Sequence, residues 1–174
     1  MSRINYDLKK IRGVVFDIDG VLSPTVVPMS PDGIPMRMAN LKDGYAIVQA
    51  IKKGIMIAII SGADVPQIRG RFEPIGVKDI YLGHLDKLSV LKDWMAMRGL
   101  SPEEIAYAGD DIPDIAPMKH IGLAVAPRDA ASDVKAIADF ITAADGGQGV
   151  GRELLEEIMK ARGLWPTSAE AFGK

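Results

Sequence analysis

Short apolar segments alternate with amphipathic stretches along most of the 174-residue chain. The apolar segments predict strands at residues 14–16, 55–60, 79–82, 105–108, 122–125 and 140–142. The stretches between them have helical spacing and predict helices at about 44–53, 64–72, 88–98, 130–138 and 150–161. The run at 55–60 is too uniformly apolar for a strand with one exposed face, so we expect it at the centre of a parallel sheet. This alternation predicts an α/β fold, in which a central parallel sheet lies between two layers of helices.

A proline-rich segment interrupts the alternation directly after the first strand. Its four prolines, at positions 24, 28, 31 and 35, exclude a helix between residues 23 and 41. Apolar residues at 26–29 and 34–38 flank the turn sequence Pro31-Asp32-Gly33, which predicts a β-hairpin extension. Prolines combined with apolar side chains are typical of an edge that packs on another surface.

The composition is that of one globular domain, with 48% hydrophobic and 25% charged residues. We expect this domain at residues 1–163, with a C-terminal helix at about 150–162 and a tail at 164–174. The 21 basic and 23 acidic residues give a net charge of -2, which argues against non-specific binding of nucleic acid. The absence of cysteine excludes thiolate catalysis and cysteine metal sites.

The sequence carries no signal for membrane attachment. Residues 1–10 lack the apolar stretch of a signal peptide, and no apolar run approaches the thickness of a bilayer. We therefore expect a cytoplasmic protein.

Carboxylates cluster where predicted strands end. The acidic residues concerned are Asp17, Asp19, Asp110, Asp111 and Asp114. If the extended conformation persists through Asp17 and Asp19, both point to the same side, and two such charges need a cation or a shared proton. In parallel sheets ligands bind beyond the carboxyl ends of the strands. We therefore expect these groups at one edge of the sheet, together with Ser61 after a strand and Lys87 at the start of a helix.

Carboxylates, one ammonium group and one hydroxyl group suit phosphoryl transfer. Carboxylates at a water-accessible edge favour a hard cation such as Mg²⁺, which also binds phosphate oxygens. Lys87 and Ser61 are suited to hold the other phosphate oxygens. One of the first two aspartates would attack phosphorus, and the other would protonate the leaving oxygen and then activate water.

Each of these groups also has a structural interpretation when it is taken singly. Asp-x-Asp-Gly is commonly a turn or a helix cap, Ser61 suits a cap of the next helix, and Lys87 suits a solvated helix position. An EF-hand is excluded, because Val21 and Pro28 stand where that calcium loop needs oxygen ligands. The order of the groups along the chain favours the functional interpretation.

Taken together, the groups resemble the motifs of a known superfamily. The four motifs are Asp17-Ile18-Asp19-Gly20-Val21-Leu22, Ile60-Ser61-Gly62, Lys87 and Gly109-Asp110-Asp111-Ile112-Pro113-Asp114. Their order is similar to that in the haloacid dehalogenase superfamily of phosphatases, over residues 11–142. The resemblance implies the Rossmann-like three-layer α/β/α sandwich of that superfamily, with Mg²⁺ as cofactor.

The same resemblance implies a role for each motif residue. Asp17 would be the nucleophile and a Mg²⁺ ligand. Asp19 would be the general acid and base and would bind the metal through its backbone carbonyl, and Asp110 would be the third protein ligand. The phosphate-binding residues would be Ser61, Gly62 and Lys87, and the residues that support the metal and Lys87 would be Asp111 and Asp114.

A closer resemblance is to the phosphatases of 3-deoxy-D-manno-octulosonate 8-phosphate (KDO 8-phosphate). It is carried by the hairpin, Lys42-Asp43-Gly44, Arg71 and Gly146-Gly147-x-Gly149-x-x-Arg152-Glu153. The intervals between Asp17, Ser61 and Lys87 are too short for a cap domain. The resemblance implies a function in lipopolysaccharide precursor biosynthesis. It also implies a homotetramer in which hairpins from four subunits assemble and a neighbouring subunit covers the active site.

One position departs from the pattern of this branch. Members tend to carry arginine after the glycine of the second motif, and relatives acting on nine-carbon keto-deoxy sugar phosphates tend to carry glutamate, whereas this chain has Ala63. Arg71 is suited to pair with a sugar carboxylate, since its planar guanidinium matches that anion, but an exposed helix arginine is the alternative. A nine-carbon substrate therefore stays open, as does a non-catalytic phosphate-binding or assembly subunit. A phosphomutase is disfavoured by the missing cap.

Local signals predict three further features. Asp43 is a candidate cap for the helix that follows it. The glycine-rich segment 146–149 is typical of a flexible linker, whereas the resemblance suggests a tail that folds over a neighbouring site. Trp165-Pro166 and the residues after it are expected to form a loosely ordered end.

Overall fold

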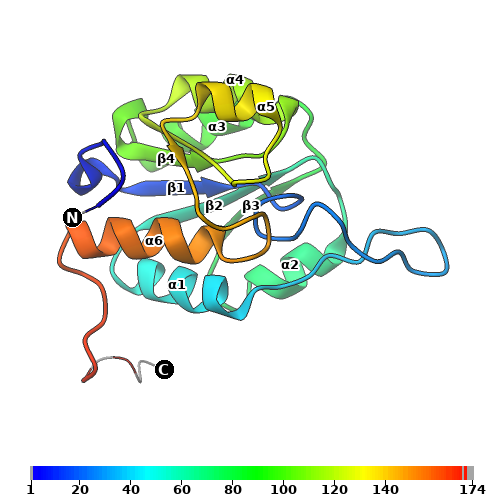
Figure 1. Cartoon of the computed structure of the whole chain (residues 1–174), viewed down its shortest axis with the longest axis horizontal. Coiled ribbons are helices and arrows are strands. Elements are labelled where there is room, and N and C mark those ends of the chain that lie inside the picture. Colours follow the sequence, from blue (N-terminus) through cyan, green and yellow to red (C-terminus); the bar gives the residue numbers. More distant parts are fainter. Residues whose placement is uncertain (1, 170, 172–174) are drawn as a thin grey trace.

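Six parallel strands form one sheet in the order β3-β2-β1-β4-β5-β6, as the computed structural model shows for residues 2–169 and 171 (Figure 1). The strands are β1 (Gly13–Phe16), β2 (Met56–Ser61), β3 (Asp79–Leu82), β4 (Ile105–Ala108), β5 (Leu123–Ala126) and β6 (Phe140–Ile141). The chain runs outward from β1 to β3 and then returns to the other side of β1 as β4. The carboxyl ends of β1 and β4 therefore lie at the point where the strand order reverses, which is the usual ligand site of such sheets.

Helices cover both faces of this sheet (Figure 1). One layer contains α1 (Leu41–Lys52), α2 (Pro66–Phe72) and α6 (Val150–Ala161), and the other contains α3 (Lys87–Arg98), α4 (Ile115–His120) and α5 (Ser132–Ile137). Side chains alternate between two buried clusters, so that Val14 and Phe16 pack toward the first layer and Val15 packs toward the second. The three-layer α/β/α prediction is confirmed. The hydrophobic pattern does not predict α4, a helix of 6 residues that contains Pro117.

Short 3₁₀ helices occur at η1 (Leu8–Lys10), η2 (Pro102–Glu104) and η3 (Ile112–Asp114). Among the described residues, no helix is long and apolar enough to cross a membrane.

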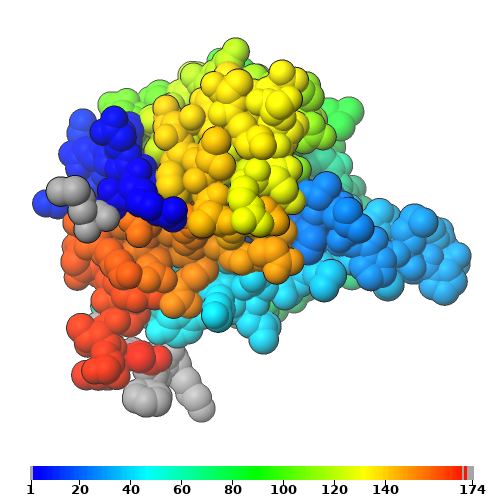
Figure 2. Space-filling view, viewed as in Figure 1, coloured from blue at the N-terminus to red at the C-terminus, as the bar shows by residue number. Residues whose placement is uncertain are grey.

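The proline-rich segment projects from the body of the protein as a hairpin-like extension (Figure 2). Its two arms meet at a single antiparallel bridge between Met29 and Pro35, and the Met36 amide donates to the Pro28 carbonyl at 2.8 Å. The predicted turn is present, with Gly33 at a φ of 78°. Six large apolar side chains on or beside the extension are 46–86% exposed, namely Val26, Met29, Ile34, Met36, Met38 and Leu41. The extension therefore presents an apolar surface to solvent, which is unusual for a lone subunit.

The prediction that Asp43 caps its own helix is wrong. Asn40 caps α1 instead, since its side-chain oxygen accepts hydrogen bonds from the amides of Lys42 and Asp43. Asp43 is buried within α1, and its Oδ1 accepts from the Arg152 amide at 2.7 Å. Because Gly149, the residue before α6, has no side chain, Asp43 supplies the missing cap of α6 from a different helix.

The expectation of a loosely ordered end is wrong for Trp165. Its ring meets the ring of Tyr45 edge to face, with centroids 6.3 Å apart. The guanidinium carbon of Arg152 lies 4.8 Å from the centroid of Trp165, within the range of a cation–π contact. The chain after α6 is thus held against α1. Residues 170 and 172–174 of the predicted tail lie outside the described residues.

Burial raises the pKa of Asp43 from 3.8 to about 6, although the amides of Arg152 and Gly151 and the charges of Arg152 and Arg71 oppose this. Because the folded state binds this proton more tightly, protonated Asp43 stabilises the fold, and that stabilisation is lost as the pH rises through about 6. We expect the free energy of unfolding of the wild type to fall by about 2 kcal/mol relative to Asp43→Asn between pH 4.5 and 7.5. Urea unfolding of both proteins measures this, and a difference that does not change with pH would contradict it.

Candidate active site

Asp17 lies at the carboxyl end of β1 and is buried, with 6% of its surface exposed. Its amide continues the pairing with β4 by donating to the Ala108 carbonyl at 3.1 Å. One carboxylate oxygen accepts from the Ile18 amide at 2.7 Å, and the other accepts from the Lys87 ammonium at 2.7 Å. The carboxylate is therefore held on both oxygens, at the edge that the sequence predicts.

Lys87 is the first residue of α3 and places its ammonium group in the buried interior. The nitrogen donates to Asp17 and, at 2.8 Å, to Asp114. Burial by itself would lower the pKa of Lys87, but the two carboxylates outweigh burial and raise the pKa. Lys87 is thus a permanent cation beside Asp17.

Asp114 is completely buried and has a partner for each oxygen. One oxygen accepts from Lys87 and from the Tyr107 hydroxyl, the latter at 2.9 Å. The other accepts from the backbone amides of Asp110 and Asp111 at 3.0 and 3.4 Å. Asp114 therefore fixes both Lys87 and the loop after β4. The contribution of Tyr107 was not predicted, because a tyrosine inside an apolar strand looks like a core residue.

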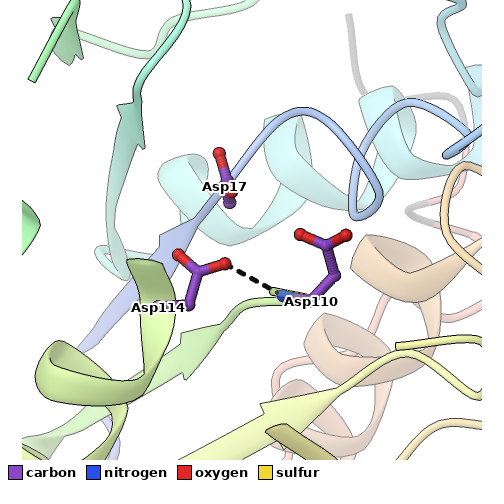
Figure 3. Close-up of side chains that lie close together, drawn as sticks. All are labelled: Asp17, Asp110 and Asp114. Atoms are coloured by element: carbon purple, nitrogen blue, oxygen red, sulfur yellow. Dashed lines mark hydrogen bonds between the residues drawn. The ribbon is translucent and has the colours of Figure 1, made fainter. Parts of the chain in front are cut away.

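Three carboxylates from two strand ends gather in one cluster (Figure 3). Oxygens of Asp17, Asp110 and Asp114 all lie within 4.8 Å of one another. Burial and the charge of Asp114 raise the pKa of Asp17 well above its usual range, despite the opposing effect of Lys87. Burial, Asp114 and Asp111 raise the pKa of Asp110 to about 7. The single ammonium group of Lys87 does not balance the negative charge of three carboxylates, so the cluster has room for a further positive charge.

The donor set fits a hard divalent cation. The oxygens of Asp114 already accept four hydrogen bonds, whereas the carboxylate of Asp110 is only partly buried and accepts no hydrogen bond from any other described residue. Asp17 and Asp110 are therefore the side chains that would hold Mg²⁺, which takes one or two carboxylates and keeps several waters. Asp114 would hold these groups in place without binding the metal itself, which is the role that the resemblance implies for it.

Gly20 and the glycine-rich segment 146–149 shape the loop after Asp17. Gly20 has a φ of 79°, and a β-carbon there would overlap the carboxylate of Asp110. The Gly147 amide donates to the Val21 carbonyl at 2.8 Å, and a β-carbon on Gly146 would overlap the Gly20 carbonyl. The segment is therefore no free linker, because it packs against the active-site loop of its own chain.

Asp19 does not join the acidic cluster. β1 ends at Phe16 and the chain turns at Ile18, so the extended conformation on which the expectation for Asp17 and Asp19 rests does not persist, and that expectation is wrong. The carboxylate of Asp19 accepts two hydrogen bonds from Arg37 of the hairpin, from Nε and Nη2, both at 2.9 Å. Arg37 was not predicted, although it is the one basic residue among the apolar residues of the second hairpin arm.

Ser61 and Gly62 lie at the carboxyl end of β2. Ser61 is buried, and its hydroxyl accepts from the Ala63 amide at 3.2 Å. Apart from its two neighbours in the chain, no described residue lies within 4 Å of the position that a β-carbon of Gly62 would occupy, so this face is open. Asp111 is exposed, and its carboxylate accepts from the Ile112 amide at 2.8 Å, which makes it a cap of η3.

Arg71 lies on α2, beside a cavity of about 520 Å³ between that helix and the hairpin. Mostly apolar side chains line the cavity, and Ile18 connects it with the Asp17 loop. The Nε atom of Arg71 is buried and has no hydrogen-bond partner. Its Nη2 would overlap a β-carbon at Gly44, which explains physically why glycine stands at that position.

Comparison with known proteins agrees with this geometry. The family profile of haloacid dehalogenase-like hydrolases matches residues 76–154. The 3-deoxy-D-manno-octulosonate 8-phosphate phosphatase of Escherichia coli K12 is 34% identical over 155 residues, which cover 89% of this chain and 82% of that protein. The crystal structure of the phosphatase of the same name from Yersinia pestis is 33% identical, with a TM-score of 0.86 over 90% of this chain and 85% of the other.

A structure from Moraxella catarrhalis carries the same enzyme name and contains magnesium, phosphate and KDO. It is 30% identical, with a TM-score of 0.85 over 89% of both chains. The chain therefore belongs to the haloacid dehalogenase-like hydrolases, and within them to the family of these sugar-phosphate phosphatases. It is a phosphatase enzyme, and Mg²⁺ is its cofactor.

Replacing Asp110 by asparagine is expected to weaken Mg²⁺ binding while it stabilises the metal-free protein. At pH 8 the raised pKa of Asp110 means that its charge destabilises the metal-free protein, so Asp110→Asn is expected to raise the melting temperature without metal. Millimolar Mg²⁺ is expected to raise the melting temperature of the wild type by a few degrees and that of Asp110→Asn hardly at all.

Thermal unfolding with and without Mg²⁺ measures both effects. Asp93→Asn is the matched control, because Asp93 is an exposed aspartate of α3 that has no role in the site. An equal Mg²⁺ response in wild type and Asp110→Asn would exclude Asp110 as a ligand.

Proposed function

We propose that the protein hydrolyses KDO 8-phosphate to KDO and phosphate, in a Mg²⁺-dependent step of lipopolysaccharide precursor biosynthesis. The observation that carries the proposal is the carboxylate of Asp17, held at the end of β1 by Lys87 and within reach of Asp110. The relatives that bear this enzyme name, one of them with KDO bound, support the choice of substrate.

Asp17 is the proposed nucleophile. The Ile18 amide and Lys87 fix its two oxygens, so little motion is needed for attack on phosphorus. A bound Mg²⁺ supplies the positive charge that lets an anionic nucleophile approach an anionic ester. The bond that forms joins Asp17 to phosphorus, and the bond that breaks joins phosphorus to the sugar oxygen.

Asp19 is the proposed proton carrier. It gives a proton to the leaving sugar oxygen and then takes one from the water that hydrolyses the phospho-aspartate. Lys87, the Ser61 hydroxyl and the open backbone of Gly62 hold the phosphate oxygens, where negative charge lies in the transition state. Asp111 and Asp114 support the metal and Lys87.

The cavity beside Ile18 is the proposed site of the sugar. Its apolar walls suit the carbon skeleton, and the guanidinium of Arg71, which lines the cavity, suits an anionic group of the substrate. Ala63 contributes no charge at the position where branch members carry arginine, so a nine-carbon keto-deoxy sugar phosphate is the alternative substrate.

The proposed assembly is a homotetramer in the cytoplasm, formed by the domain at residues 1–163. The exposed apolar side chains of the hairpin, such as Val26 at 86% and Met29 at 70%, support a surface that a neighbouring subunit covers. In a protein without a cap, such a neighbour would exclude water from the site.

A panel of phosphate esters tests the reaction. Purified protein with Mg²⁺ is expected to release phosphate fastest from KDO 8-phosphate, more slowly from a nine-carbon analogue, and slowly from an aryl phosphate. Asp17→Asn is expected to lower kcat by at least about a thousandfold, because the nucleophile is removed. Phosphate release from none of these esters would favour the non-catalytic subunit, and full activity of Asp17→Asn would exclude Asp17 as nucleophile.

Sedimentation velocity at micromolar concentration tests the assembly. The wild type is expected to sediment as a tetramer, and Met29→Asp, which places a charge on the hairpin surface, is expected to shift it to smaller species. Met97→Asp is the control, because Met97 is an exposed methionine of α3, outside the hairpin. A monomeric wild type would contradict the proposal.

A further inference from the structure

Arg37 connects the hairpin with Asp19. Its Nε and Nη2 atoms bind the two carboxylate oxygens of Asp19 at 2.9 Å each, and its Nη1 donates to the Pro35 carbonyl at 3.1 Å. This two-point pair holds the carboxylate toward the hairpin, and Asp19 is not among the acidic residues that cluster around Asp17. A proton carrier held in this way reaches a leaving oxygen beside Asp17 only after the pair with Arg37 has opened.

Opening the pair leaves the charged guanidinium of Arg37 without an anionic partner. The side chain of Arg37 is 16% exposed, whereas that of Asp19 is 51% exposed. Water can solvate Asp19 after it turns away, but it reaches the guanidinium much less well. A mostly buried positive charge without an anionic partner is costly, so the exchange needs a second anion that binds Arg37.

The cavity beside the site is where such an anion would arrive. Arg37 and Arg71 both line it, and Asp32 is the one acidic residue among its lining residues. No hydrogen bond joins Asp32 to Arg37 among those recorded for the described residues, so Asp32 does not replace Asp19 in this structure. The planar guanidinium of Arg37 already binds one carboxylate with two hydrogen bonds, and the same fork fits another.

We propose that Arg37 exchanges one carboxylate for another. The carboxylate of an acidic sugar phosphate takes the place of Asp19 on the guanidinium, and the released Asp19 turns to the leaving oxygen. The inference rests on the proposed function, since it takes Asp19 as the proton carrier and a sugar acid as the substrate. A phosphate ester without a carboxylate leaves Asp19 held by Arg37, so Arg37 determines specificity for acidic substrates.

Comparing one acidic and one neutral substrate tests the exchange. For Arg37→Ala, kcat/KM with KDO 8-phosphate is expected to fall about tenfold or more, because a charged two-point contact is lost. With phenyl phosphate, which has no carboxylate, kcat/KM is expected to stay constant or rise, because Asp19 is no longer held. The ratio of the two kcat/KM values therefore falls at least about tenfold. Arg37→Lys keeps the positive charge but loses the planar group that forms two parallel hydrogen bonds. For this variant we expect a ratio of kcat/KM values between those of the wild type and Arg37→Ala.

Arg98→Ala is the matched control. Arg98 binds Asp79 through its Nε and Nη2 atoms, at 2.9 and 2.6 Å, as Arg37 binds Asp19. This pair lies at the amino end of β3, whereas the active site lies at the carboxyl ends of the strands. For Arg98→Ala, the ratio of kcat/KM with KDO 8-phosphate to kcat/KM with phenyl phosphate is expected to equal that of the wild type. Equal losses for both substrates in Arg37→Ala and Arg37→Lys, or no loss for either, would overturn the exchange and leave the proposed function intact. A wild type that hydrolyses neither ester would instead overturn the proposed function.

Discussion

The buried ion pair of Asp17 with Lys87 is the interaction on which the rest of the site depends. Lys87 also binds Asp114, so one ammonium joins the end of β1, the start of α3 and the loop after β4. Loss of one partner from such a buried pair typically costs about 3–5 kcal/mol, because a buried charge is left alone. Burial, and after it the charge of Asp114, raises the pKa values of Asp17 and Asp110, and the single ammonium of Lys87 faces three carboxylates. A divalent cation bound there would complete this network, and in the proposed function the metal, the nucleophile and the phosphate site therefore lie together.

The sequence predicts what depends on local pattern and fails where a tertiary contact decides. Uniformly apolar runs identify the strands, and parallel topology then brings Asp17 and Asp110 to one edge. Asn40 and Asp43 have the same capping chemistry, and only the contact of Asp43 with α6 shows which of them caps α1. The direction of Asp19 follows from the turn of the chain at Ile18, a change of backbone direction that strand alternation does not predict.

In the proposed function, recognition of the sugar involves other residues than those of the reaction. The reacting groups lie in motifs at strand ends, whereas the cavity is lined mainly by the hairpin and α2, the segments that follow the first and second motifs, together with Ile18 and Leu22 of the first motif. The hairpin carries both an exposed apolar surface and Arg37, the residue that holds Asp19. In the proposed function, assembly, substrate choice and proton transfer therefore all involve the hairpin, and this makes the chemistry easier to predict from sequence than the substrate.

The central claim is that Asp17 becomes phosphorylated during turnover. Asp19→Asn is expected to slow hydrolysis of the intermediate, because the group that activates water is missing. Mass spectrometry of this variant, mixed with KDO 8-phosphate and Mg²⁺ and then quenched in acid, locates the phosphoryl group. The account predicts phosphate on the peptide that contains Asp17, at that residue. Phosphate on another residue, or turnover without any phosphorylated protein, would contradict it.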